Sequence, residues 1–458
     1  MRLGRRALGA AVLVIAAACT PPTPPEEPTL AETLGLPSDT PLLDVACAPV
    51  AGVCTSSIQA QVDAVPAGTT AIVRVAAGQY RESVRISAKS VHLVGAGAAS
   101  TIIDGTGLTP VAGSTRFGVV VAQAPNSSVR RLTVRNFSAM DHDHFRSALR
   151  AESTAGVVFE DVTVADNSYA GIGLSEASGA RLTRVTAAGN DAIGIAAYRA
   201  NGLVLTDSLV AGNTDTLRYQ DEQEQYRESA GFKTTESHNV LVTKSTFRDN
   251  GSTGVWTDVG TSDSVISFNT VVNNKWHGIE TEISDHITVA NNTVLHNADG
   301  TSTFADSRHG ILVLDSSNIR VENNIVRHRR GVTDLGWSQA LRLAETEFRP
   351  VHPAIGQPPT DTVGVVIVGN TVEELAPTGS VLGFYDALGE HGAIDMLAQA
   401  DGNTYRRATG ALLGTDSTGV GTVAWIGFSQ DNAVALAQWR AWRCASVCRE
   451  QASTLGGL

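Results

Sequence analysis

The sequence predicts an all-β protein in which short strands wind into a single parallel β-helix. A unit of roughly 23 residues repeats from about residue 118, and most units carry an asparagine nineteen residues after their start, as Asn167, Asn190 and Asn213 do. After each start, apolar or small side chains alternate with others, as in GIGLSEASGARL (171–182). Short strands with a period of two, joined by turns and repeated at this spacing, are typical of a parallel β-helix.

The alternation assigns the two faces of one strand in every coil. The side chains expected to point inward lie one and three residues after each start: Val119, Leu149, Ile172, Ile195, Phe232, Val255, Ile279 and Ile311, and then Val121, Ala151, Leu174, Ala197, Thr234, Thr257, Thr281 and Val313. The asparagine column predicts one tight turn in which amides stack along the axis. One unit is a residue longer and carries the pair Asn273 and Asn274 at this place.

The repeats GIAAYRANGLVL (194–205) and GIETEISDHITV (278–289) resemble those of the right-handed β-helix repeat family of exported bacterial proteins, within the pectin-lyase-like superfamily. The resemblance covers roughly residues 56 to 375. It implies a single-stranded, right-handed coil with an N-terminal capping helix and a C-terminal cap. This fold carries polysaccharide lyases, hydrolases, epimerases and non-catalytic adhesins, so the repeats indicate the fold and leave the chemistry open.

The N-terminus has the features of an export signal. Residues 1–19 place three arginines before an apolar run that is too short to span a bilayer. Small residues before Cys19 resemble the lipobox of bacterial lipoproteins, although Ala16 stands where leucine is usual, so a plain secretory signal is the alternative. We therefore expect an exported lipoprotein, held to the cell surface or the periplasmic side of a membrane through Cys19 alone. Residues 20–40 are Pro-rich, as expected for a tether.

Charge and cysteine content narrow the range of partners. The chain has 34 basic and 46 acidic residues, a net charge of −12, so it lacks the basic surplus that nucleic-acid binding needs. Besides Cys19, four cysteines form two close pairs. In an oxidising compartment we expect disulfides between Cys47 and Cys54 and between Cys444 and Cys448, with a zinc site as the weaker alternative. A monomer is expected.

The β-helix domain is predicted to span residues 41–458, with clear repeats over 118–330. Before them, residues 57–107 resemble the capping helix and first strands of the family. Residues 331–362 lack the repeat and are predicted to leave the coil as a surface excursion, and 363–375 read as a further coil. A C-terminal cap is expected over 400–450, with a strand at 401–407 and an amphipathic helix at 433–443.

The outward positions of the same strands carry the main functional signal. Lys233, Trp256 and Glu280 lie two residues after successive starts, and Asp258 and Glu282 lie four after. Neighbouring coils lie about 4.8 Å apart, so three carboxylates are expected in one patch. Like charges there favour a bound cation, a raised pKa or compensation by Lys233. A merely solvated acidic face is the plainer interpretation.

The resemblance adds roles for these residues. Glu280-Thr281-Glu282 looks like the Glu-x-Glu calcium pair of the lyases that include chondroitinase B and alginate lyases, which implies Ca²⁺ at Glu280, Glu282 and Asp258. In those enzymes calcium neutralises a uronate carboxylate and a lysine takes the C5 proton. The family's lysine is absent after the pair here, so Lys233 is the candidate base, together with Asp258 and Glu282 as catalytic groups.

Other residues are candidates for substrate binding. Trp256 is expected to be an exposed platform for a sugar ring, extended by Tyr198 two coils away. Arg150 and Arg308 could assist, and His277 and His309, one residue before their starts, could titrate near neutral pH or simply occupy a turn. Segments 138–147, 214–230 and 298–309 lengthen the chain before this strand and are expected to flank the face; the first holds Asp141-His142-Asp143-His144, a weak metal candidate.

Three functions follow as hypotheses. The first is a calcium-assisted lyase or C5-epimerase acting on an acidic polysaccharide. The second is a glycoside hydrolase that uses the Asp258 and Glu282 carboxylates. The third is a lipoprotein that binds glycan or protein, or spaces something from the membrane, without turnover.

Overall fold

The computed structural model describes residues 28–108, 117–138, 147–214, 229–297, 308–329, 339–346, 361–375, 381–386 and 396–407, and the backbone alone of 422–426, 433–435 and 454–457. The chain divides into two units, Met1–Thr40 and Pro41–Leu458. In the described part of the first unit, α1 (Leu30–Thr33) is a single turn closed by reciprocal hydrogen bonds between Thr29 and Glu32. No helix among the described residues is long and apolar enough to cross a membrane.

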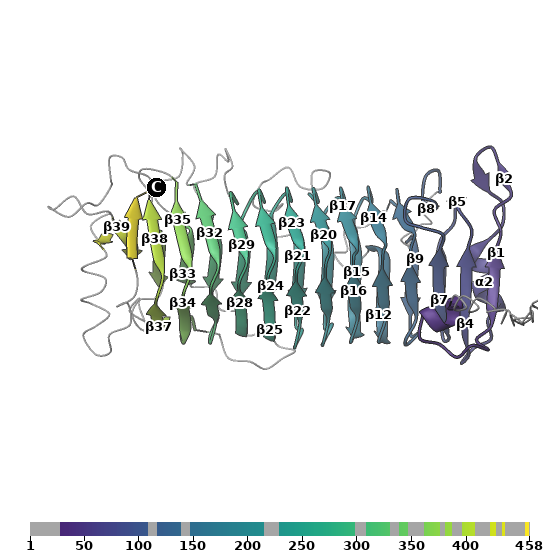
Figure 1. The fold of residues 1–458 in the computed structure, drawn as a ribbon, viewed down its shortest axis with the longest axis horizontal. Coiled ribbons are helices and arrows are strands. Elements are labelled where there is room, and N and C mark those ends of the chain that lie inside the picture. Colours follow the sequence, from purple (N-terminus) through teal and green to yellow (C-terminus); the bar gives the residue numbers. More distant parts are fainter. Residues whose placement is uncertain are drawn as a thin grey trace, which may run out of the picture. The chain divides into compact units, whose positions relative to one another are not determined.

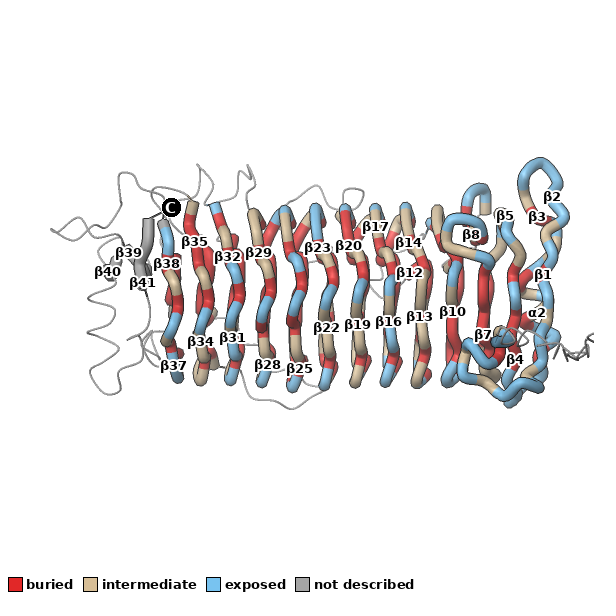
Figure 2. Tube along the Cα trace, in the orientation of Figure 1, coloured by how far each residue is buried: buried red, intermediate tan, exposed pale blue. Residues whose placement is uncertain are grey.

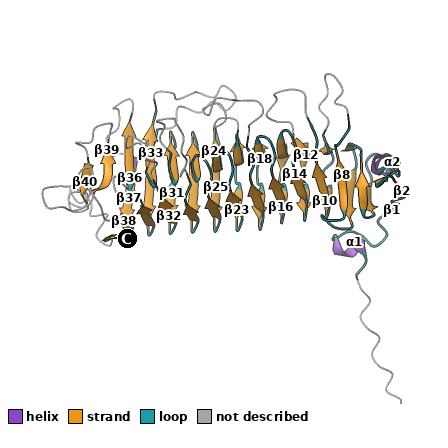
Figure 3. Ribbon diagram, turned by 90° about the horizontal axis from the view of Figure 1, so that it is seen from above, coloured by secondary structure: helices purple, strands orange, loops and turns teal. Residues whose placement is uncertain are grey.

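The second unit is a solenoid in which each coil gives one strand to each of three parallel sheets (Figures 1 and 3). Sheet 1 contains, in spatial order, β1 (Leu42–Val45), β4 (Thr70–Val75), β7 (Ser90–Gly95), β10 (Ser128–Arg130), β13 (Val158–Glu160), β16 (Arg181–Thr183), β19 (Val204–Thr206), β22 (Leu241–Thr243), β25 (Ser262–Ser267), β28 (Asp285–Ala290), β31 (Arg320–Glu322), β34 (Val365–Val368) and β37 (Leu397–Asp401). Sheet 2 contains β5 (Gly78–Tyr80), β8 (Thr101–Asp104), β11 (Thr133–Arg135), β14 (Thr163–Ala165), β17 (Thr186–Ala188), β20 (Leu209–Ala211), β23 (Thr246–Arg248), β26 (Thr270–Val272), β29 (Thr293–Leu295), β32 (Ile325–His328), β35 (Thr371–Glu374), β38 (Thr404–Arg407) and β41 (Thr454–Gly457). Sheet 3 contains β6 (Val84–Ser87), β9 (Val119–Ala122), β12 (Ser147–Ala155), β15 (Ala170–Ser178), β18 (Ile193–Tyr198), β21 (Ala230–Thr235), β24 (Thr253–Asp258), β27 (Ile279–Glu282), β30 (Ile311–Leu314), β33 (Leu341–Glu345), β36 (Leu382–Asp386), β39 (Thr422–Ile426) and β40 (Ala433–Ala435).

The core fills the inside of the coil (Figure 2). Both predicted inward columns of sheet 3 are buried, and each residue pairs with the expected partner in the next coil, as Phe232 does with Val255 and Val255 with Ile279. The prediction of an all-β parallel coil, its register and its inward face is therefore confirmed. Alternation suffices here because a one-residue slip would turn the apolar set outward.

Two asparagine ladders run along the axis where the sequence predicted one. In the first, each side-chain amide donates to the next at 2.8–3.0 Å, through Asn167, Asn190, Asn213, Asn250, Asn274 and Asn297. The second joins Asn269, Asn292, Asn324, Asn370 and Asn403 at 3.0–3.1 Å. Asn274 takes the ladder position in the longer coil, while Asn273 adopts the left-handed turn conformation with φ 55°.

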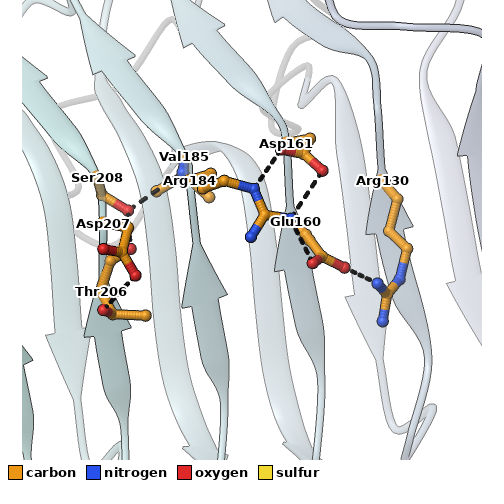
Figure 4. A network of polar contacts seen from close by, with 8 residues as sticks. All are labelled: Arg130, Glu160, Asp161, Arg184, Val185, Thr206, Asp207 and Ser208. Carbon is orange, nitrogen blue, oxygen red and sulfur yellow. Dashed lines mark hydrogen bonds and ion pairs between the residues drawn. The ribbon is translucent and has the colours of Figure 1, made fainter.

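The turns between sheets 1 and 2 carry charged residues on their outer surface (Figure 4). Asp161, Arg184 and Asp207 occupy the same left-handed turn position in successive coils. Arg184 donates two hydrogen bonds to Asp161 and one to Glu160, which also pairs with Arg130. Arg184 and Asp161 are about half exposed, so each of these pairs contributes little to stability on its own.

The N-terminal end is closed as expected. Helix α2 (Ile58–Ala64) packs Ile58 and Val62 against the first coil, and the Ser57 side chain accepts a hydrogen bond from Ala60 at its start. A hairpin of β2 (Pro49–Val50) and β3 (Val53–Cys54) precedes it. The expected disulfide between Cys47 and Cys54 is present.

Two expectations for the C-terminal half are corrected. The segment predicted as an excursion contains β33, whose Leu341 and Leu343 are buried in the coil and continue the inward columns. The predicted helix at 433–443 begins instead with β40, which pairs antiparallel with β39. The strand expected at 401–407 is confirmed as β38. Cys19, Cys444 and Cys448 lie outside the described residues.

Candidate functional site

The outer face of sheet 3 brings together the residues that the sequence singled out. Lys233 on β21, Trp256 on β24 and Glu280 on β27 are direct register partners. Asp258 and Glu282 follow the paired residues Thr257 and Thr281, which places them side by side in the companion column. The predicted placement of these residues side by side on neighbouring coils is thus confirmed.

Trp256 differs from the exposed platform that was expected, since only 3% of its surface is accessible. Its ring lies against Lys233, whose Nζ is 3.4 Å from the ring centroid, and its Nε1 donates to Glu282 Oε2 at 3.1 Å. The indole belongs to a small apolar cluster with Ala170, Ile193 and Ala230. Small outward side chains on the preceding coils leave room for the ring to pack, so Trp256 is part of the site's framework.

Each carboxylate of the patch already has a partner. Lys233 Nζ lies 3.0 Å from Asp258 Oδ2. Thr253 Oγ1 donates to the fully buried Glu280 at 3.0 Å, and Glu282 accepts from Trp256. The structure therefore combines two of the three ways of relieving like charges that the sequence suggested, namely compensation by Lys233 and a raised pKa.

Glu282 is the carboxyl with the raised pKa. Burial raises its pKa well above the usual range, the neighbouring charges of Asp258 and Glu280 add to the effect, and Lys233 opposes it. A carboxyl whose pKa is raised by burial and by neighbouring carboxylates is typical of acid–base sites.

His277 and His309 are stacked, with ring centroids 5.2 Å apart and planes within 4°. The backbone N–H of His309 donates to His277 Nδ1, and that of Gln339 to His309 Nδ1, so both rings carry their proton on Nε2. Burial and the charge of Arg342 hold both pKa values well below 6.5, and Arg308 adds to the effect at His277. The idea that these histidines titrate near neutral pH is therefore wrong.

Two buried arginines border the patch. Arg308 lies over Trp276, 4.4 Å from the ring centroid, and donates to the Lys275 carbonyl. Arg342 stands two coils after Glu280 in the same outward column, beyond Leu312. Sequence reasoning missed Arg342 because its segment was taken as an excursion, although the alternation in ALRLAE was available as a signal.

The remaining candidates lie farther from the carboxylates. Arg150 occupies the Lys233 column three coils earlier, and its Nε is 3.0 Å from Glu152. Tyr198 lies one coil before Thr235 in the companion column, with Arg199 over its ring at 4.8 Å. Segment 141–144 lies outside the described residues, as do most of the three long segments, whose ends join sheet 2 to sheet 3.

The carboxylate patch does not suit a bound calcium ion as arranged. Calcium takes six to eight oxygen ligands. Among the described residues, no three His, Cys, Asp or Glu side chains are grouped so that they could hold a metal ion. Asp258 is turned to Lys233 and Glu282 to Trp256, so these carboxylates are engaged by protein groups.

Comparison with known proteins finds similarity to a family model and to solved structures. A family model described as the right-handed β-helix region matches residues 117–226 and 221–326. A search of curated proteins finds no match. Among solved structures, the A-module of mannuronan C-5 epimerase AlgE6 from Azotobacter vinelandii is similar with a TM-score of 0.53 and 16% identity, covering 87% of this chain and 94% of the module. The AlgE4 A-module from the same organism gives 0.48, 16%, 81% and 94%, and the periplasmic alginate epimerase AlgG gives 0.45, 15%, 76% and 79%.

The structural similarity to the AlgE6 A-module shows a shared fold. Residues 117–326 match the model of the right-handed β-helix region, and the solenoid has the right-handed parallel β-helix fold.

Proposed function

We propose that the protein acts on an acidic polysaccharide at the outer face of sheet 3, as a lyase or C5-epimerase. The observation that carries the proposal is Glu282, a carboxyl with a raised pKa, beside the ion pair of Lys233 and Asp258. Groups with strongly shifted pKa values next to a specific charge partner concentrate at catalytic sites. The A-module of mannuronan C-5 epimerase shares this fold, which makes mannuronan the first polymer to test.

The shared first step of both reactions is removal of the proton at C5 of a uronate. The C5–H bond breaks, and its electron pair spreads into the neighbouring carboxylate. Elimination then expels the oxygen at C4 and leaves an unsaturated sugar, whereas epimerisation returns a proton to the opposite face of C5. Either course needs a cation at the carboxylate and a base near C5. Elimination also needs a proton for the leaving oxygen, and epimerisation needs a proton donor on the opposite face, which water can supply.

The proposed roles of Lys233, Glu282 and Asp258 differ from those expected from the sequence. Asp258 and the face of the Trp256 ring hold the Lys233 ammonium group in place, where it can neutralise the uronate carboxylate. The ionised form of Glu282 takes the C5 proton, and its raised pKa makes this form a stronger base. Glu282 then carries that proton and can give it to the leaving oxygen at C4 in the elimination. Asp258 positions Lys233.

The test incubates the purified protein with mannuronan, pectate and chondroitin and follows the ultraviolet absorbance of unsaturated uronates and deuterium uptake at C5. We expect Glu282→Gln to abolish both signals, by about 100-fold or more. Lys233→Arg keeps the cation and is expected to keep part of the activity, whereas Lys233→Met loses it. Equal loss in Lys233→Arg and Lys233→Met would instead make Lys233 the base, and full activity in Glu282→Gln would sink the assignment.

A second candidate function rests on the same two carboxyls. Asp258 and Glu282 on adjacent coils, with one pKa raised, would also serve a glycoside hydrolase. Product analysis separates the two, because a hydrolase releases new reducing ends without unsaturated sugars. Binding without any change in the polymer would favour a non-catalytic glycan-binding protein.

We further propose that the protein is exported and held to a membrane by a lipid on Cys19. The signal-like residues 1–19 support this location. Cys19→Ala is expected to move the protein from the membrane fraction to the soluble fraction and to abolish labelling by radioactive palmitate. Labelling that persists in the variant contradicts the anchor.

A further inference from the structure

Ile283 directly follows Glu282 and adopts a left-handed backbone conformation, with φ 45°. Left-handed turn residues are common in this solenoid, but almost all are Asn, Asp, Gly or other unbranched residues. Among the described residues with positive φ, Ile283 is the one with a β-branched side chain. A branched Cβ crowds the following carbonyl in this conformation, so the backbone is strained.

In the neighbouring coils, the corresponding turn is formed by residues that adopt the left-handed conformation with less strain. Glu236 and Gly260 take the left-handed conformation in the two preceding coils, and Asp315 takes it in the coil after. The backbone of Ile283 is held from both sides, because its N–H donates to Leu314 at 3.1 Å and its carbonyl accepts from Gly260 at 2.8 Å. The stacked coils therefore impose the conformation whatever the side chain is.

Folding gives no reason for an isoleucine at this position. Its side chain is half-buried, and it is not among the residues that form or pack against the hydrophobic clusters of the described structure. The strain is thus not offset by burial in the core. Such strain can mark residues kept for binding or catalysis, and Ile283 differs from the exposed Phe268 in lying directly after a carboxyl of the candidate site.

We propose that Ile283 is a substrate-contacting residue, whose branched apolar side chain packs against the C–H face of the sugar ring held beside Glu282. This inference rests on the proposed function and extends it to ring recognition. The stiff χ1 of a β-branched residue offers a pre-formed apolar surface next to the charged groups. An asparagine or glycine would relieve the strain but would leave that surface polar or empty.

The test compares Ile283→Asn with the matched control Phe268→Asn. Phe268 is also bulky and left-handed, with φ 58° and 60% exposure, but it lies in the turn between sheets 1 and 2. We expect both changes to raise Tm by roughly 1–3 °C, because each relieves strain. Only Ile283→Asn is expected to lower kcat/KM, by roughly tenfold and mainly through KM, as for the loss of an apolar contact.

Two results would overturn the inference about Ile283. The first is wild-type kcat/KM in Ile283→Asn, which would leave the strain without a function. The second is a lower Tm in that variant, which would show that the side chain stabilises the fold. If the wild-type protein acts on no polymer, both the proposed function and the sugar contact at Ile283 are wrong. If the wild type is active and the Ile283 variant is equally active, only the sugar contact is wrong.

Discussion

Replacing Asn250 by alanine should be among the most destabilising single changes in the solenoid. Asn250 lies in the middle of the first asparagine ladder, in the turn before β24, and only 1% of it is exposed. Its Oδ1 accepts hydrogen bonds from the backbone N–H and the Nδ2 of Asn213, and its Nδ2 donates to the Val210 carbonyl and to Asn274 Oδ1.

The size of the effect follows from these four contacts. A typical hydrogen bond contributes about 1 kcal/mol net, and a buried group left without its partner costs about 1–3 kcal/mol. The variant loses four hydrogen bonds and strands a backbone N–H and a carbonyl. We therefore expect the free energy of unfolding to fall by about 4 kcal/mol.

Guanidinium chloride denaturation followed by circular dichroism measures this change. The control is Asn201→Ala, because Asn201 is exposed and its Oδ1 accepts a single hydrogen bond, from His238. We expect the control to lose less than about 1 kcal/mol. A fall of similar size in both variants would refute the reasoning, since the ladder would then add nothing beyond one surface contact.

The remaining predictions concern pH, packing and metal. The pKa of His277 is lowered in the folded protein, so below pH 6.5 the unfolded chain takes up a proton that the folded chain does not, and this proton uptake destabilises the fold. His277→Asn should therefore gain stability relative to wild type as the pH falls below 6.5, by up to about 1.4 kcal/mol per pH unit. The comparison with wild type is needed because the raised pKa of Glu282 acts in the opposite direction, and parallel pH profiles of the two proteins in melting experiments would contradict the prediction. Gly78→Ala should lower Tm by several degrees, because its Cβ would lie 2.2 Å from Cys54 Sγ and 2.6 Å from Cys47 Sγ; an unchanged melt would refute the close packing. EDTA should leave both activity and Tm unchanged, whereas a calcium-dependent rise in either would restore the metal site expected from the sequence.

Periodicity predicted the solenoid because every coil has to bury the same face of its strands, so the same pattern of apolar residues recurs. The inward columns, the register of Lys233 with Trp256 and Glu280, and the first asparagine ladder all follow from spacing alone. The same logic could have found β33, whose leucines keep the period although long segments without repeats surround them. The second ladder was not predicted, because its asparagines follow the strands of sheet 1 and only the strands of sheet 3 were aligned from coil to coil.

The chemistry of the site was harder to predict because alternation gives a side chain's direction and not its surroundings. Trp256 points outward as expected, yet it is buried against Lys233 and small residues of other coils. The stack of His277 on His309 depends on backbone donors from two further coils. Such contacts join residues about 30 positions apart in the chain and become visible only once the coils are stacked.

The coils on either side of residues 214–229 are paired as closely as those with no inserted chain between them. Ile193 pairs with Ala230 and Asn213 bonds to Asn250 across 37 residues with the same geometry that other ladder members keep across 23. The number of residues between a strand of sheet 2 and the next strand of sheet 3 therefore does not affect how the coils stack. Segments at this boundary can be lengthened, shortened or exchanged while the framework beneath stays unchanged, so a new specificity can arise on this scaffold without a new fold.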